Sequence, residues 1–117
     1  MEYNTYSELA SRTMADLGYR QKDNLHMVLG MVDELGEIAK IFKAELAYNK
    51  KIDYVNLEEE VGDLMWFVSN LCRTNNLDMG KVLDKNIAKL KVRYPDKYSD
   101  DKANNRDLKK ERETLES

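Results

Sequence analysis

Apolar residues recur at helical spacing along most of the chain. The spacing predicts a first helix over residues 2–17, with Gly18 as its C-terminal stop. It predicts three further helices over residues 24–48, 57–74 and 79–94. With one Pro and five Gly in 117 residues, few positions interrupt these helices. The predicted fold class is therefore all-α, a helical bundle.

The helix expected over residues 24–48 carries two apolar stripes. The first has the period of a core-facing side and contains Leu25, Val28, Leu29, Val32, Gly36 and Ala39. The second lies on a different side and contains Met27, Met31, Ile38 and Ile41. Glu34 falls in the middle of this second stripe, where a simple surface helix would be polar. We therefore expect the helix to be covered on two sides, with a carboxylate inside the second covered strip.

Capping residues suggest where the later helices begin and end. Asp23, Asn56 and Asp78 are N-cap candidates for the second, third and fourth helices, and Pro95 ends the fourth. On the third helix, the expected core stripe is Leu57, Val61, Leu64, Val68 and Leu71. A second line on that helix contains Asn56, Glu60, Asp63, Phe67 and Asn70. The charged segment from about residue 96 is expected to be solvated, with a short exposed helix over residues 105–116.

Composition narrows the class of protein. The length suits one domain with a modest core, so residues 1–117 are taken as a single domain with a charged tail. The net charge of -3 does not argue for a nucleic-acid partner, because a nucleic-acid binder usually needs a basic face. Cys72 is the one cysteine, which excludes an intramolecular disulfide. Neither a signal peptide nor an apolar run of about 18 residues is present, so we expect a cytoplasmic protein without a membrane partner.

Two acidic pairs share one spacing. Glu34 and Glu37 lie three residues apart, as do Glu60 and Asp63. On a helix this spacing places both side chains of a pair on one face, about 5–6 Å apart at Cβ. Two such helices facing each other would gather four carboxylates, which is unfavourable without a cation. Acidic pairs at this spacing also occur on ordinary solvated helix faces, so the spacing alone leaves both interpretations open.

The surroundings of the pairs favour a site. Each pair has a glycine beside an acid, Gly36 and Gly62, and a helical glycine costs about 1 kcal/mol relative to alanine. Such glycines suggest close packing or close approach of a ligand. Apolar and aromatic residues rather than lysines flank both pairs, and Phe67 shares the line of Glu60 and Asp63. Phe67 is therefore a candidate to stack on a base, although Trp66 could do the same.

An oxygen-only cluster predicts a hard cation. Mg²⁺ binds carboxylates and bridges to substrate phosphates, and Mn²⁺ is a substitute. Neither acidic stretch contains His, which disfavours zinc and a Glu-x-x-His di-iron site, and the calcium-loop spacing is absent. The predicted chemistry is metal-assisted hydrolysis of a phosphate ester or phosphoanhydride.

Three ordered blocks carry a family resemblance. They are Glu34-Leu35-Gly36-Glu37, Glu60-Val61-Gly62-Asp63-Leu64-Met65-Trp66, and the block from Asn86 to Pro95. Together they resemble the MazG-like nucleoside triphosphate pyrophosphohydrolases of the all-α NTP pyrophosphatase superfamily. The resemblance implies a four-helix core completed by oligomerisation, as a homodimer or homotetramer. It also implies hydrolysis of a nucleoside triphosphate to the monophosphate and pyrophosphate.

The resemblance further implies roles for individual residues. The Mg²⁺ ligands would be Glu34, Glu37, Glu60 and Asp63. Lys89 and Arg93 would reach the triphosphate, with Asn86 beside them, although pairing of these cations with the abundant acids is the plain alternative. Many members have Glu where this chain has Asp33, so a firm role for Asp33 does not carry over. Glu37 or Asp33 would accept the proton of the attacking water.

Three functions are compatible with these residues. The first is a house-cleaning nucleotide pyrophosphohydrolase. The second, within the same superfamily, is phosphoribosyl-ATP pyrophosphohydrolysis. The third is a non-catalytic helical module that binds a basic partner through the acidic faces, which the apolar flanks and the basic strip of the fourth helix disfavour.

Overall fold

A computed structural model describes all residues, 1–117, and contains six helices and no strands. The all-α prediction is therefore confirmed. The helices are α1 (Tyr3–Ser11), α2 (Arg20–Tyr48), α3 (Tyr54–Thr74), α4 (Met79–Arg93), α5 (Asp100–Asn104) and α6 (Leu108–Glu116). The chain forms two compact units, Met1–Leu77 and Asp78–Ser117. No helix is both long enough and apolar enough to cross a membrane.

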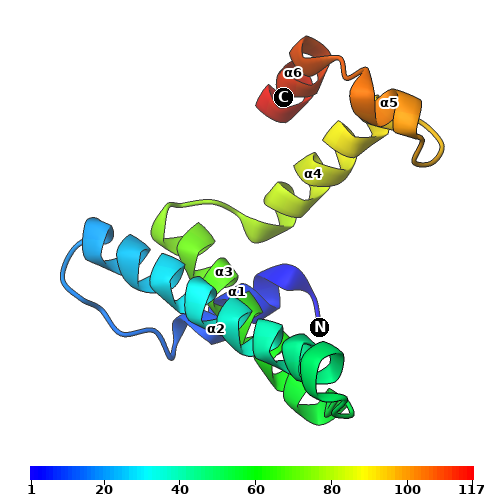
Figure 1. The fold of residues 1–117 in the computed structure, drawn as a ribbon. Helices are drawn as coiled ribbons and strands as arrows, with labels where there is room; N and C mark the ends of the chain where they lie inside the picture. The colour runs from blue at the N-terminus through cyan, green and yellow to red at the C-terminus, as the bar shows by residue number, and fades with distance from the viewer. The chain divides into compact units, whose positions relative to one another are not determined.

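The first unit is a pair of long antiparallel helices with a short third helix against it. α2 and α3 lie side by side, and α1 packs on α3 (Figure 1). A short turn reverses the chain between the long helices. Asn49 ends α2 in the left-handed region at φ 51°, where asparagine is one of the few tolerated residues. Asp53 then caps α3 by accepting hydrogen bonds from the N–H groups of Val55 and Asn56.

The structure corrects the predicted start of two helices and the end of another. The first helix ends at Ser11 rather than near residue 17. The second begins at Arg20, so Asp23 lies inside its first turn and accepts a hydrogen bond from the Leu17 N–H instead of capping the helix. Asp53 caps the third helix in place of Asn56. Of these three boundaries, only the start of α3 has a side-chain cap, and Asp53 lies outside the apolar period of that helix.

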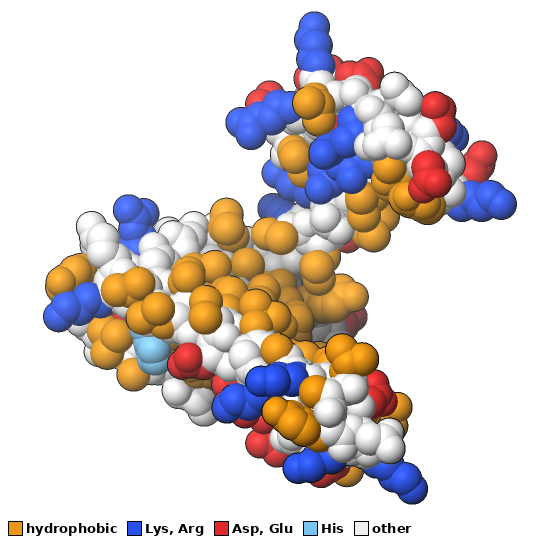
Figure 2. Space-filling view, viewed as in Figure 1, with side chains coloured by type: hydrophobic (Ala, Val, Ile, Leu, Met, Phe, Trp, Pro, Cys, Tyr) orange, Lys and Arg blue, Asp and Glu red, His pale blue; other side chains and the backbone are white.

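Of the two sides of α2 predicted to be covered, the single chain covers one. The stripe expected to face the core is exposed, with Leu25, Val28, Leu29 and Val32 each 44–59% accessible and the neighbouring Leu35 53% accessible. α3 packs instead on the other stripe, where Met27 is fully buried and Met31, Ile38 and Ile41 are half-buried. Figure 2 shows hydrophobic side chains gathered over the surface of this unit. The single chain therefore leaves an apolar face of α2 uncovered.

Polar side chains cross-link the helices of the first unit. Asn24 on α2 and Asn75 at the end of α3 exchange reciprocal amide hydrogen bonds of 3.3 and 2.7 Å. Asn70 is fully buried, and its amide nitrogen donates to the Ala10 carbonyl on α1. Buried amides are stabilising only when they are paired in this way. These hydrogen bonds therefore fix how α1, α2 and α3 are aligned more specifically than apolar contacts alone would.

The second unit is built from α4, α5 and α6, each begun by a side-chain cap. Asp78, Ser99 and Asp107 accept hydrogen bonds from the N–H groups at the third position of their helices. Asp78 was the predicted cap of the fourth helix, so that prediction is confirmed. The helix expected over residues 105–116 is α6.

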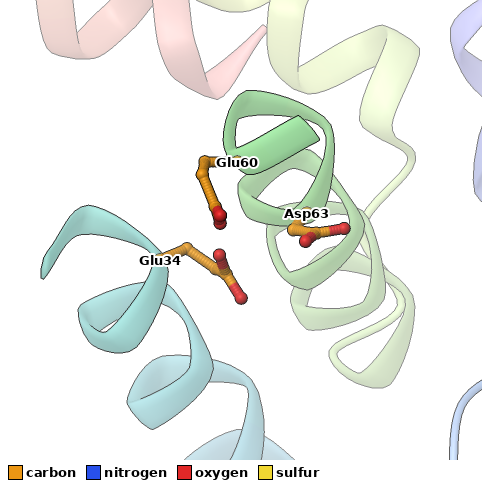
Figure 3. A group of neighbouring side chains, drawn as sticks. All are labelled: Glu34, Glu60 and Asp63. Atoms are coloured by element: carbon orange, nitrogen blue, oxygen red, sulfur yellow. The ribbon is translucent and has the colours of Figure 1, made fainter. Parts of the chain in front are cut away.

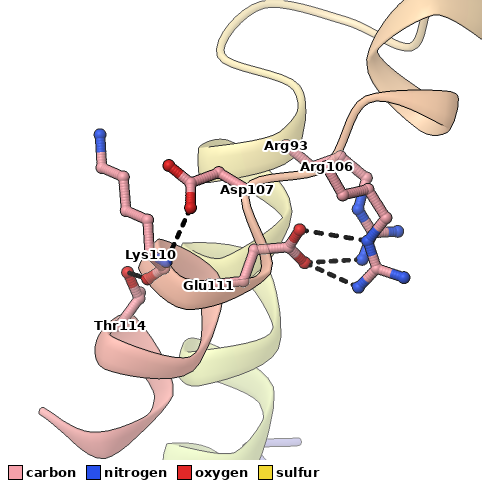
Figure 4. A network of polar contacts seen from close by, with 6 residues as sticks. All are labelled: Arg93, Arg106, Asp107, Lys110, Glu111 and Thr114. Carbon is pink, nitrogen blue, oxygen red and sulfur yellow. Dashed lines mark hydrogen bonds and ion pairs between the residues drawn. The ribbon is translucent and has the colours of Figure 1, made fainter.

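The tail is less solvated than expected. Glu111 on α6 is only 3% exposed, and its carboxylate faces two arginines (Figure 4). Arg93 on α4 approaches its carboxylate at 2.7 Å, and Arg106 donates to both carboxylate oxygens at 2.9 and 3.1 Å. The pairing lowers the pKa of Glu111 to about 2, with Arg106 as the largest cause and Arg93 next. This ion cluster joins α6 to α4.

Candidate metal centre

Three of the four predicted metal ligands meet between α2 and α3. Glu34, Glu60 and Asp63 each place one carboxylate oxygen within 4.8 Å of the others. Glu34 extends from α2 toward Glu60 on α3, and Asp63 lies beside them one turn along α3 (Figure 3). The i, i+3 spacing on α3 and the antiparallel packing of the two helices together produce this arrangement.

The cluster is electrostatically unfavourable as it stands. The pKa of Glu34 is raised to about 7, first by a hydrogen bond with Glu60, then by burial, and then by the charges of Glu60, Asp63 and Glu37. Two facing carboxylates can share a hydrogen bond only if one of them holds a proton. The second oxygen of Glu34, Oε2, is buried without a hydrogen-bond partner. Either a proton or a cation is needed to relieve this repulsion.

The donor set suits a divalent cation with oxygen ligands. Three carboxylates converge on one point, two half-buried and one exposed, so solvent and a substrate can still reach an ion held there. The unpartnered Glu34 oxygen is an available ligand atom. No His or Cys belongs to the group, which matches Mg²⁺ or Mn²⁺ rather than zinc.

Glu37 and Asp33 lie on the same part of α2 but outside the three-carboxylate group. Glu37 is exposed and pairs with Lys40 at 3.3 Å. Its charge still contributes to the raised pKa of Glu34. Asp33 is exposed. The structure therefore brings together Glu34, Glu60 and Asp63, whereas Glu37 and Asp33 are exposed acids outside this group.

An aromatic cavity adjoins the carboxylates. Glu34, Asp63, Trp66 and Phe67 line a cavity of about 270 Å³. Phe67 was a predicted substrate contact, and its ring does lie in the same cavity as two of the acids. Tyr6 on α1 is a neighbour that the pattern of the sequence did not indicate. Burial and the charge of Asp63 raise the pKa of its phenol.

The two glycines next to the acids have no close neighbour within the chain. A Cβ added at Gly36 or Gly62 would meet nothing within 4 Å. Close packing inside the chain, one of the two reasons given for these glycines, is therefore wrong. The glycine that does permit close packing is Gly30, where a Cβ would lie 2.1 Å from the Phe67 ring. Gly30 thus allows Phe67 to sit directly against the backbone of α2.

The predicted phosphate-contacting residues all belong to α4 in the second unit. Asn86 is exposed and Lys89 is half-buried. Arg93 is engaged by Glu111, and its Nε–H is buried without a hydrogen-bond partner. Arg93 is therefore paired with an acid of its own unit. Pairing with nearby acids was the alternative to phosphate binding that the sequence left open.

A larger cavity lies elsewhere in the first unit. It measures about 430 Å³ and is lined by Ser11, Met14, Ala15, Asp16, Arg20, Asp23, Arg73 and Thr74. Its two aspartates accept hydrogen bonds from backbone N–H groups of Gly18 and Leu17, and two arginines offset their charge. The acids of the larger cavity thus have hydrogen-bond partners, whereas Glu34 and Asp63 at the smaller cavity belong to the group of three carboxylates that repel one another.

A family model and a relative both match most of the chain. The family model described as the MazG nucleotide pyrophosphohydrolase domain matches residues 22–98, which contain all the predicted site residues. The Gene 37 protein of Mycobacterium phage L5 is 29% identical over 101 residues, covering 80% of this chain and 89% of that protein. No solved structure matches the chain.

Proposed function

The chain belongs to the MazG nucleotide pyrophosphohydrolase family, and from that premise we propose the reaction that it catalyses. The reaction is Mg²⁺-dependent hydrolysis of a nucleoside or deoxynucleoside triphosphate between the α and β phosphates, giving the monophosphate and pyrophosphate. The observation that carries the proposal is the approach of Glu34, Glu60 and Asp63 to within 4.8 Å without a neighbouring cationic side chain. Such a group is suited to an ion that also binds phosphate.

We propose that the acids differ in role, some binding the metal and others accepting a proton. Glu34, Glu60 and Asp63 would hold Mg²⁺, with Glu37 as a fourth ligand or a group acting through water. When bound, the ion would supply positive charge to the phosphate oxygens and lower the pKa of a nearby water. Glu37 and Asp33, which are exposed, are the groups we propose to accept the proton of the attacking water. The water attacks the α phosphorus in line as pyrophosphate leaves.

Cationic and amide groups on α4 are proposed to bind the triphosphate. Lys89 and Arg93 would offset the charge of the leaving pyrophosphate, and Asn86 would donate a hydrogen bond. Glu111 accepts from one Nη of Arg93, so other N–H groups of the guanidinium remain to bind an anion.

We propose that a second copy of the chain covers the exposed apolar face of α2. That face is continuous over Leu25, Val28, Leu29, Val32 and Leu35, and obligate interfaces are commonly apolar in this way. Light scattering on the purified protein is expected to give at least twice the mass of one chain. A monomer at micromolar concentration would contradict this proposal.

The proposed reaction is tested with a panel of natural and modified (d)NTPs. Purified protein with Mg²⁺ is expected to release pyrophosphate and the matching monophosphate from at least one of them, and chelation of the metal is expected to stop the release. Cleavage between the β and γ phosphates would instead give a nucleoside diphosphate and orthophosphate. Those products would contradict the proposed cleavage site. The panel includes phosphoribosyl-ATP. Turnover of that substrate alone would identify the protein as a phosphoribosyl-ATP pyrophosphohydrolase. No turnover with any substrate would favour a binding module.

A further inference from the structure

Trp66 is held in one orientation by a contact that the proposed metal site does not require. Its indole Nε1–H donates to the Thr13 hydroxyl oxygen at 2.8 Å. The Thr13 hydroxyl in turn donates to the Ala10 carbonyl at 3.0 Å. Thr13 lies just past the end of α1, and Trp66 is on α3. The chain thus uses a relay of two hydrogen bonds to fix the indole beside the cavity.

A ring contact with Phe67 also restricts the indole. The rings of Trp66 and Phe67 meet edge-to-face, with centroids 4.9 Å apart and an interplanar angle of 87°. Phe67 is itself positioned by Gly30, because any Cβ there would collide with its ring. His26 contacts the Phe67 ring from α2, also edge-on, at 6.2 Å. Both aromatic rings are therefore restricted before any ligand arrives.

The two rings share their cavity with two of the metal-site carboxylates. The lining consists of Glu34 from α2 and of Asp63, Trp66 and Phe67 from α3. At about 270 Å³ the cavity is slightly below the usual size of a small-molecule site, about 300–1,000 Å³, so it suits part of a nucleotide rather than the whole. Trp66 is half-buried rather than part of a closed core, so the cavity can be reached by a ligand.

We infer that Trp66 is the surface on which the substrate's base stacks, and that Thr13 is a positioning residue that orients the indole for this contact. The inference rests on the proposed function for the identity of the ligand, a nucleotide with its phosphates at the metal site. Among the lining side chains the one neutral hydrogen-bonding group is the indole N–H of Trp66, which already donates to Thr13. Stacking on an aromatic ring tolerates any base, so this contact contributes to binding without selecting among bases.

The absence of any other tryptophan makes the inference directly measurable. Trp66 is the sole tryptophan of the chain, so intrinsic tryptophan fluorescence reports on this ring alone. The full-length protein with Mg²⁺ is titrated with an α,β-methylene nucleoside triphosphate, which resists cleavage at the proposed bond. Stacking is expected to quench the emission of Trp66 in a saturable manner, with a purine and a pyrimidine analogue alike.

Variants of Thr13 test the positioning role. Thr13→Val keeps the shape of the side chain and removes the hydroxyl, whereas Thr13→Ser keeps the hydroxyl. For Thr13→Val we expect KM to rise about tenfold for purine and pyrimidine triphosphates, since stacking is worth about 5-fold to 150-fold in binding, with kcat within about twofold of the original chain. Thr13→Ser should restore KM and the quenching. A role in stability alone would lower the melting temperature of Thr13→Val without this split between KM and kcat.

The outcomes separate this inference from the proposed reaction. Pyrophosphate release together with unchanged Trp66 emission and an unchanged KM in Thr13→Val would overturn the stacking inference and leave the reaction standing. Saturable quenching by the analogue without release of pyrophosphate from any triphosphate would support the nucleotide-stacking site and overturn the reaction.

Discussion

Glu34 in the first unit and Glu111 in the second are both withdrawn from solvent, but their neighbours carry opposite charge. Glu34 faces Glu60 and Asp63, and its pKa is raised to about 7 (Figure 3). Glu111 faces Arg93 and Arg106, and its pKa is lowered to about 2 (Figure 4). A carboxylate whose charge is already matched contributes to the fold. One whose charge is unmatched remains available to bind a cation, and this difference separates a structural acid from a functional one.

Loss of a carboxylate from the unmatched cluster should have the largest effect on activity. Asp63→Asn keeps the shape of the side chain and removes the negative charge, so the cluster should bind Mg²⁺ poorly. Substitution of groups that only support metal ligands costs about 10–100-fold, so we expect pyrophosphate release to fall by at least about 100-fold. Glu58→Gln, an exposed acid on the same helix, is the matched control and should retain activity. Full activity of a folded Asp63→Asn protein would remove Asp63 from the proposed metal site.

Neutralising the matched carboxylate should instead weaken the fold. Glu111→Gln leaves Arg93 and Arg106 without their shared counter-charge, and we expect the melting temperature at pH 7 to fall by several degrees. Glu113→Gln, an exposed position on the same helix, should change little. Thermal unfolding followed by circular dichroism measures both. Equal melting temperatures for the two variants would show that the ion cluster contributes nothing to stability.

The ion cluster of Glu111 with Arg93 and Arg106 also predicts how stability depends on pH. The pKa of Glu111 is lower in the folded chain than its ordinary value of 4.5, so its stabilising contribution is complete above about pH 4.5. The contribution is lost as the pH falls through about 2, where the folded chain also takes up the proton. The difference in melting temperature between the original chain and Glu111→Gln should therefore shrink across this range. A difference that stays constant down to pH 2 would contradict the lowered pKa.

The smallest predicted effect has the opposite sign. Glu34→Gln removes one charge from the repulsive cluster, so in the absence of divalent metal it should stabilise the chain at pH 8. Ionised Glu34 is disfavoured in the fold because its pKa is raised from 4.5 to about 7. We expect a gain of about 1 kcal/mol, below the full value of the shift because water screens the cluster. Denaturant unfolding in chelator tests this, with the exposed Glu45→Gln as control. A loss of stability in Glu34→Gln would show that Glu34 is a structural acid like Glu111.

Local signals predicted much of the fold. Helical spacing located the four principal helices, and Asp78 and Pro95 bracketed the fourth almost to the residue. The i, i+3 pairs placed Glu60 and Asp63 on one face because that depends only on helix geometry. Glu34, the third acid of the group, was identified by its spacing to Glu37 and because it interrupts an apolar stripe of α2.

Tertiary features were harder to predict. α2 has two apolar stripes, and periodicity alone does not say which one α3 covers and which stays exposed on the single chain. The Thr13–Trp66 hydrogen bond joins residues 53 positions apart, and nothing local to Thr13 indicates it. Glu111 lies in a segment whose composition resembles a solvated tail, so its burial beside two arginines depends on the packing of α6 on α4.

The amide pair between Asn24 and Asn75 has a consequence for the distant carboxylates. Methionine, isoleucine and leucine contacts between antiparallel helices are tolerant of axial sliding, whereas two amides that exchange hydrogen bonds match at one alignment only. A slip by one turn would displace α2 along α3 by about 5.4 Å. That distance exceeds the 4.8 Å within which Glu34, Glu60 and Asp63 gather. The Asn24–Asn75 pair thus fixes the register between α2 and α3 that brings the three acids together.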